Sequence, residues 1–260
     1  MEKKALLVIS FGTTYSVAQH AIGQIEDCLA AQFPEYDCYR AFTSGMVIAK
    51  LRREQGIEVW NPEQAMEALK EKGYKQVLCQ TLHVIPGQEY DKMRSMLRKF
   101  RGDFESILVG RPMLFFKEDY EISAKALLQA MEPLEEQEAL VLMGHGTEHF
   151  ANSAYSQLEH MFYFLGHERV FVGTVEGFPG LDYVLKRLAE HDIKKVRLAP
   201  FMIVAGDHAR NDLAGEEEDS WKSVLESKGY ETETWLHGLG EIPAIGTLFS
   251  EHLKKAQELD

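Results

Sequence analysis

The stretch ALVLMGHGT at residues 139–147 repeats the stretch ALLVISFGT at residues 5–13, and this pair decides the fold of the chain. Each stretch is a continuous apolar run that leads into a glycine-containing turn. Such a run is typical of a buried strand in a parallel sheet that is covered on both faces. A second pair follows in the same order, VLCQTLHVIPGQE at 77–89 and VRLAPFMIVAGDH at 196–208. The chain is therefore predicted to contain two similar α/β halves.

Strands alternate with helices in both halves, which predicts parallel βαβ units with right-handed crossovers. The expected strands lie at residues 5–10, 37–42, 75–82, 105–109, 138–143, 169–175, 194–201 and 231–236. Asn61 and Pro62 mark a helix start, with asparagine as the cap and proline at the first helical position. The predicted fold is two doubly wound halves, each with a central parallel sheet flanked by helices, and a cleft between the halves.

The two halves are expected to divide the 260 residues near the middle, into residues 1–130 and 131–260. The Glu-rich segment Met131–Gln137 is the expected linker. A final helix is expected from about Pro243 to Glu258. The sequence leaves open whether this helix packs back on the first half.

Composition excludes several classes of protein. The chain has 28 Lys and Arg against 41 Asp and Glu, a net charge of −13, which argues against nucleic-acid binding. It has no signal peptide and no apolar run of the ~18 residues that a membrane span needs, so no membrane partner is expected. Its three cysteines form no C-x-x-C pair, which favours a reduced, cytoplasmic setting. Phosphate-binding loops, dinucleotide fingerprints and nucleophile elbows are also missing from the sequence, so ATP use, NAD binding and triad hydrolysis lack support.

The repeats differ at loop positions that follow strands, where open α/β sheets bind their ligands. His145 lies between Gly144 and Gly146, and the matching position of the first half is Phe11. The scaffold therefore does not require histidine there, which favours a functional imidazole over an incidental one. His208 matches Glu89 in the second pair, so the pseudo-symmetry predicts that both face the same cleft.

Glu176 ends the second strand of the second half and completes a candidate set of two imidazoles and one carboxylate. Three such ligands with an open position suit a divalent transition metal. Each residue also has an ordinary interpretation: His208 as a surface residue in a first helical turn, and Glu89 as a carboxylate favoured by a helix N-terminus. His83 is interpreted as a partner of Glu89 or as a satisfied histidine at a strand end.

Several segments in this order resemble the sirohydrochlorin cobaltochelatases of the CbiK type, a family of class II chelatases. The resemblance covers the whole chain and depends on ALLVISFGT at 5–13, RAFTSGM at 40–46, LHVIPGQEY at 82–90, MGHGTEH at 143–149, VAGDHARND at 204–212, DSWK at 219–222 and WLHGLGEIPA at 235–244. Together these motifs are specific, although each alone is weak.

The resemblance implies ATP-independent insertion of Co²⁺ into sirohydrochlorin, or into precorrin-2, in anaerobic cobalamin biosynthesis. Co²⁺ is then the substrate metal, and no ATP or organic cofactor is expected. The implied metal ligands are His145, His208 and an acidic residue, which is given as Glu176 with Glu89 kept as the alternative. The implied catalytic residues are His145, His208 and Glu89. The implied tetrapyrrole contacts are Ser10, Phe11, Gly12, Thr13, Ser44, Met46, His83 and Gly144. A homo-oligomer is left open.

Three alternatives remain at this stage. The first is insertion of iron or nickel into a related tetrapyrrole, because the ligand set does not select the metal. The second is a metal or haem carrier without turnover. The third is a structural metal site in an unrelated hydrolase, which leaves the duplicated loop positions unexplained.

Overall fold

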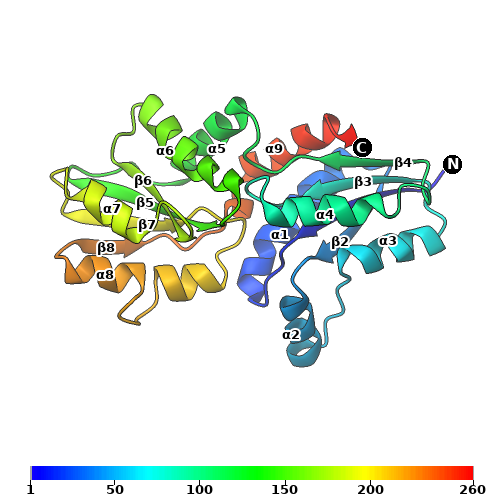
Figure 1. The fold of residues 1–260 in the computed structure, drawn as a ribbon, viewed down its shortest axis with the longest axis horizontal. Coiled ribbons are helices and arrows are strands. Elements are labelled where there is room, and N and C mark those ends of the chain that lie inside the picture. Colours follow the sequence, from blue (N-terminus) through cyan, green and yellow to red (C-terminus); the bar gives the residue numbers. More distant parts are fainter. Residues whose placement is uncertain (1, 260) are drawn as a thin grey trace. The chain divides into compact units, whose positions relative to one another are not determined.

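A computed structural model describes residues 2–259, which form two compact units. Unit 1 holds the residues up to Phe115 together with those from Pro243 onward, and unit 2 spans Phe116–Ile242. Each unit contains one sheet with helices on both of its faces (Figure 1). The predicted fold class, two α/β units that each have a parallel sheet flanked by helices, is confirmed.

Unit 1 is built on a sheet of strand order β2-β1-β3-β4-β9. Its first four strands are parallel, and β9 runs antiparallel to β4. The strands are β1 (Lys4–Ser10), β2 (Asp37–Phe42), β3 (Gln76–Thr81), β4 (Ser106–Gly110) and β9 (Gln257–Glu258), and the helices are α1 (Ser16–Gln32), α2 (Gly45–Gln55), α3 (Pro62–Glu71), α4 (Gln88–Arg98) and α9 (Pro243–Lys254).

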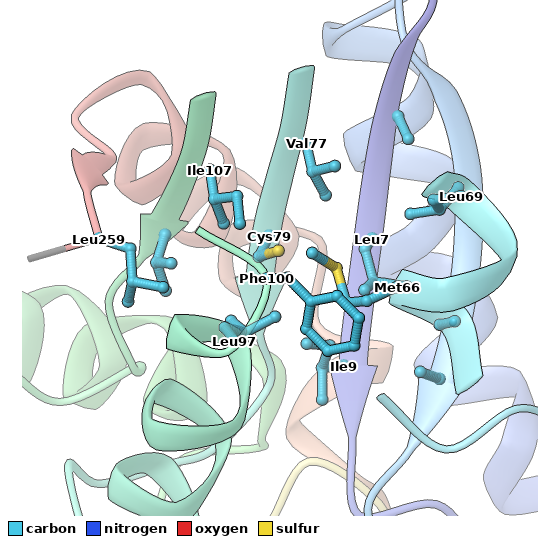
Figure 2. Close-up of a cluster of buried hydrophobic side chains, with 14 of the residues drawn as sticks. Leu7, Ile9, Met66, Leu69, Val77, Cys79, Leu97, Phe100, Ile107 and Leu259 are labelled. Atoms are coloured by element: carbon cyan, nitrogen blue, oxygen red, sulfur yellow. The ribbon is translucent and has the colours of Figure 1, made fainter. Parts of the chain in front are cut away.

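Helices cover both faces of the unit 1 sheet, so β1 is buried from Ala5 to Ser10. On one face, Leu7 and Ile9 belong to a core cluster with residues of α3 and α4, and Figure 2 shows Met66, Leu97 and Phe100 gathered over these strands. On the other face α9 lies against α1, so closely that a β-carbon on Gly246 would stand 3.2 Å from the Cys28 side chain. The predicted start of α3 is also confirmed: Asn61 Oδ1 accepts from the Gln64 N–H at 2.9 Å.

Unit 2 repeats the topology with the strand order β6-β5-β7-β8, all parallel. In both units the first strand lies between the second and the third, and the fourth strand lies beyond the third. The two units therefore share one strand order, as the sequence repeat predicts. The strands are β5 (Glu138–Gly146), β6 (Val170–Glu176), β7 (Lys195–Pro200) and β8 (Glu231–Thr234), and the helical segments are α5 (Lys117–Ala130), η1 (Phe150–Asn152), α6 (Ser153–Phe164), α7 (Leu181–Leu188), the π-helix η2 (Ala209–Leu213), α8 (Trp221–Ser227) and η3 (Leu239–Glu241).

The predicted division at residues 130 and 131 differs from the division in the structure. The whole of α5 belongs to unit 2, where it packs against α6, so the change of unit falls between Phe115 and Phe116. The expected linker Met131–Gln137 is an internal connection of unit 2 between α5 and β5. The last helix does return to unit 1, but it ends at Lys254 and is followed by β9 instead of continuing to Glu258.

Candidate metal site in unit 2

His145 projects from the end of β5. All the remaining residues of this strand are buried. Its ring lies edge-to-face against the ring of His208, with centroids 4.8 Å apart and planes at 88°. The Nδ1 atom of His145 is 3.9 Å from Oε2 of Glu176. The side chains of His145, Glu176 and His208 are 47%, 60% and 35% exposed. The three predicted ligands therefore meet at the carboxyl edge of the unit 2 sheet and are accessible to a metal ion.

The position of His145 follows from the glycines on either side of it. Gly146 has φ +84° and pairs in register with Glu176 of β6. Gly144 faces the ring of Tyr155, which a β-carbon would approach to 2.2 Å. Burial raises the pKa of Tyr155 to about 12, partly offset by hydrogen bonds with the backbone of Gly146 and His145. The backbone of Gly144 and Gly146 therefore packs directly against neighbouring residues, and His145 between them is the exposed residue of the strand.

Asp212 is a partner of His208 that sequence reasoning missed. The Asp212 Oδ2 atom lies 2.6 Å from Nδ1 of His208, and the two residues are four apart on the turn that includes η2. A carboxylate on one ring nitrogen fixes the tautomer and leaves the other nitrogen to face a metal. The sequence does contain a signal for this pair, because residues four apart in a helical turn lie on the same face. His149, by contrast, does not form a helical pair with His145, because its Nδ1 accepts from the Ala151 N–H at 3.2 Å and begins η1.

The side chains do not yet form a closed coordination shell. Within residues 2–259, no group of three or more His, Cys, Asp or Glu side chains is arranged to hold a metal ion as it stands. His145 Nδ1 lies 3.0 Å from its neighbouring Gly146 carbonyl oxygen. All three side chains are exposed, so they have room to change rotamer.

Glu89 and His83 lie in unit 1, at the start of α4 and after β3. The Glu89 carboxylate is paired with Nζ of Lys92 at 2.8 Å and is 43% exposed. The His83 Nδ1 atom is hydrogen-bonded to the Thr81 hydroxyl, and within the described chain its buried Nε2 has no hydrogen-bond partner. Burial lowers the pKa of His83 to about 4, although the negative charge of Glu89 opposes this shift. His83 is therefore neutral near pH 7 and within the electrostatic reach of Glu89.

The remaining predicted tetrapyrrole contacts differ in what they offer to a ligand. Phe11 and Met46 expose 49% and 82% of their surface, so both are free for apolar contact. Ser10 and Thr13 are buried. Ser44 is also buried, and its Oγ accepts from the Val47 N–H at 3.3 Å as the cap of α2. Gly12, at φ +90°, packs against Phe42, which gives it a structural reason to be glycine.

A pocket of about 620 Å³ lies elsewhere in unit 2. Its walls come from the α5–β5 connection, the loop before β6 and the first part of β5 and β7, including Leu140 and Arg197. Arg197 is engaged there in a buried ion pair with Glu138 at 3.0 Å. None of the predicted site residues lines this pocket, so it does not bear on the candidate site.

Comparison with known proteins shows what the whole chain is similar to. A model of the family described as cobalt chelatase (CbiK) matches residues 4–258. The chain is 43% identical over 257 residues to the sirohydrochlorin cobaltochelatase of Salmonella typhimurium, covering 98% of this chain and 96% of that protein. It is 32% identical to the sirohydrochlorin cobaltochelatase CbiKC of Nitratidesulfovibrio vulgaris, covering 98% and 91%. A solved structure of SirB from Bacillus subtilis with Fe³⁺ superimposes with a TM-score of 0.67 at 14% identity, covering 97% and 95%, and so shares the fold.

Proposed function

Because this chain belongs to the CbiK family of cobalt chelatases, we propose that it inserts Co²⁺ into sirohydrochlorin during anaerobic cobalamin biosynthesis. Insertion replaces two pyrrole N–H protons by one Co²⁺ ion. The reaction needs ligands for the metal and an acceptor for the protons, but no energy-rich cosubstrate. ATP and organic cofactors are therefore left out of the proposal. Three free cysteines fit a reduced cytoplasmic setting, which is part of the same proposal.

The observation that carries the proposal is the exposed pair of His145 and His208 beside Glu176. Imidazole nitrogens and a carboxylate oxygen are suitable ligands for divalent cobalt. A set of three leaves coordination positions open for the nitrogens of the incoming macrocycle. An open set also releases the metal more readily than a closed tetrahedral shell. We assign His145, His208 and Glu176 as the residues that deliver Co²⁺.

The protons require a base, and two candidates are kept. His145 is suitable because a neutral imidazole has a ring nitrogen that accepts a proton. Glu89 is suitable as an exposed carboxylate at the start of α4. Phe11 and Met46 offer exposed apolar surface for a macrocycle, whereas Ser44 contributes through the shape of its loop.

The test is anaerobic absorbance spectroscopy of the purified protein with sirohydrochlorin and Co²⁺. We expect wild type to accelerate conversion to the cobalt spectrum, and His145→Ala and His208→Ala each to slow it by about 100-fold or more, the usual scale for loss of an acid–base group. His160→Ala is the matched control, since His160 is an exposed histidine of α6 in the same unit.

Other outcomes point elsewhere. If the double variant His145→Ala/His208→Ala kept the wild-type rate, the assigned mechanism would be wrong. A tetrapyrrole that binds with no change of its metal-free spectrum would favour a carrier. Parallel reactions with Fe²⁺ and Ni²⁺, and with precorrin-2 in place of sirohydrochlorin, identify the preferred substrates.

A further inference from the structure

Asn152 links the loop that follows His145 to the loop that follows Glu176, through hydrogen bonds to their backbones. It is only 9% exposed and belongs to η1. Its Oδ1 accepts from the Thr147 N–H at 2.9 Å, in the loop after β5. Its Nδ2 donates to the Phe178 carbonyl oxygen, in the loop after β6. One side-chain amide therefore uses both of its polar ends on the backbones that follow the two ligands.

The same two loops are packed backbone against backbone. A β-carbon on Gly146 would stand 1.6 Å from the Glu176 carbonyl oxygen, and one on Gly177 would stand 2.9 Å from the Thr147 carbonyl oxygen and 3.3 Å from Nδ2 of Asn152. The Glu176 loop is further closed by Thr174, whose N–H and hydroxyl both donate to the Pro179 carbonyl oxygen at 2.7 and 2.9 Å. The β5–β6 pairing already joins Gly146 to Glu176 at the strand ends. The Asn152 amide is the side-chain link that continues this connection into the two loops beyond the strands.

From this geometry we propose that Asn152 is a positioning residue, which ties together the loops that follow His145 and Glu176, in addition to the β5–β6 pairing, and so prepares the pair for one metal ion. The inference rests on the proposed function, because it concerns the ligands assigned to Co²⁺. A buried amide suits this task. Its rigid planar group fixes both contacts at once, and removing it leaves both backbone partners without this hydrogen bond. Residues that orient metal ligands commonly affect metal affinity by 10–100-fold.

The experiment measures Co²⁺ binding without tetrapyrrole, from the visible d–d absorbance of the protein, together with the KM for Co²⁺ in the insertion assay. Asn152→Leu keeps the approximate volume and removes both hydrogen bonds. We expect it to weaken Co²⁺ binding and raise the KM for Co²⁺ by about 10-fold or more, with the KM for sirohydrochlorin unchanged. Asn152→Asp keeps the acceptor for the Thr147 N–H and loses the donor to Phe178, so it should fall between Asn152→Leu and wild type.

Ser220→Ala is the matched control for stability. Ser220 is 1% exposed in the same unit and also makes two hydrogen bonds to backbone, to the Gly215 carbonyl oxygen at 2.7 Å and from the Ser223 N–H at 3.1 Å. It should lower the melting temperature as Asn152→Leu does and leave Co²⁺ affinity at the wild-type value.

Three results would overturn the inference in distinguishable ways. If wild type inserts Co²⁺ and Asn152→Leu and Asn152→Asp bind it equally well, the positioning role is wrong and the proposed function stands. If Ser220→Ala loses as much affinity as Asn152→Leu, the effect is one of general stability. If wild-type protein itself binds no Co²⁺, the assignment of the metal ligands fails, and the role of Asn152 fails with it.

Discussion

Gly146 occupies the tightest position of the candidate site, and its backbone and its surroundings both call for glycine. Its φ is +84°, and a β-carbon there would stand 1.6 Å from the Glu176 carbonyl oxygen. Gly166 has a nearly equal φ of +87° but has nothing within 4 Å of its β-carbon position. An alanine at Gly166 would meet only the strain of a positive φ, whereas an alanine at Gly146 would meet that strain and a steric clash. Comparing the two substitutions therefore measures the two effects separately.

We predict that Gly166→Ala destabilises unit 2 by about 1 kcal/mol, the usual cost of a left-handed alanine. Gly146→Ala should cost about 2–3 kcal/mol more, because the strands must also move apart, and it should weaken Co²⁺ binding. Urea denaturation with hydrogen exchange in unit 2 as the probe measures both values. Equal losses for the two variants would show that the β5–β6 contact relaxes freely.

At this scale the sequence predicts the ligands better than it predicts their supports. The repeat distinguishes His145 from Phe11, and the structure brings His145, His208 and Glu176 together. Asp212 and Asn152 were missed, because their importance depends on which backbone or ring they meet after folding. Ser44 has a role that the sequence did not reveal, since its buried hydroxyl caps α2. Whether these residues bind substrate stays a prediction.

At the scale of elements, the assignment of α9 to unit 1 has a direct consequence for stability. Phe249 is fully buried in α9, a helix that packs against α1 and approaches β3 and β4. We predict that Phe249→Ala destabilises unit 1 by about 3–5 kcal/mol, the usual cost of removing a buried phenylalanine. Hydrogen exchange should show earlier opening of β1 and β3, with unit 2 unaffected. Glu251→Ala on the exposed side of α9 is the control, with a change below about 0.5 kcal/mol.

If Phe249→Ala instead loosened unit 2, the expected division into residues 1–130 and 131–260 would be the better description of the folding units. The sequence identifies β1 and β5 by their long apolar runs. It has no such run in β8 (Glu231–Thr234), which follows from the order that the second half repeats. It does not reveal β9, since two residues of an exposed strand carry no pattern, and it ends α9 too late for the same reason. The boundary was placed by composition at Met131–Gln137, whereas the structure places it by the packing of α5 against α6.

For the molecule as a whole, the proposed function assigns different tasks to carboxylates of different units. Glu176 belongs to unit 2, where it is 3.9 Å from His145 Nδ1, and Glu89 belongs to unit 1, where its charge acts on the buried His83. Among the described residues, no helix is long and apolar enough to cross a membrane. Both carboxylates are exposed. Their chemistry therefore depends on the partners that each unit provides.

We predict that the two carboxylates affect different kinetic constants. Glu176→Gln removes a charged ligand and should raise the KM for Co²⁺ and weaken Co²⁺ binding by about 10-fold or more. Glu89→Gln should leave Co²⁺ binding unchanged and lower kcat by about 100-fold, because a proton acceptor is lost. Glu63→Gln is the matched control in unit 1, since Glu63 is an exposed carboxylate paired with Lys99 at 3.2 Å.

If both Glu89→Gln and Glu176→Gln changed only the KM for Co²⁺, both carboxylates would be ligands and His145 would be the remaining base. If Glu89→Gln behaved as Glu63→Gln does, the acid–base role would belong to unit 2 alone, because the unit that binds the metal would also accept the protons.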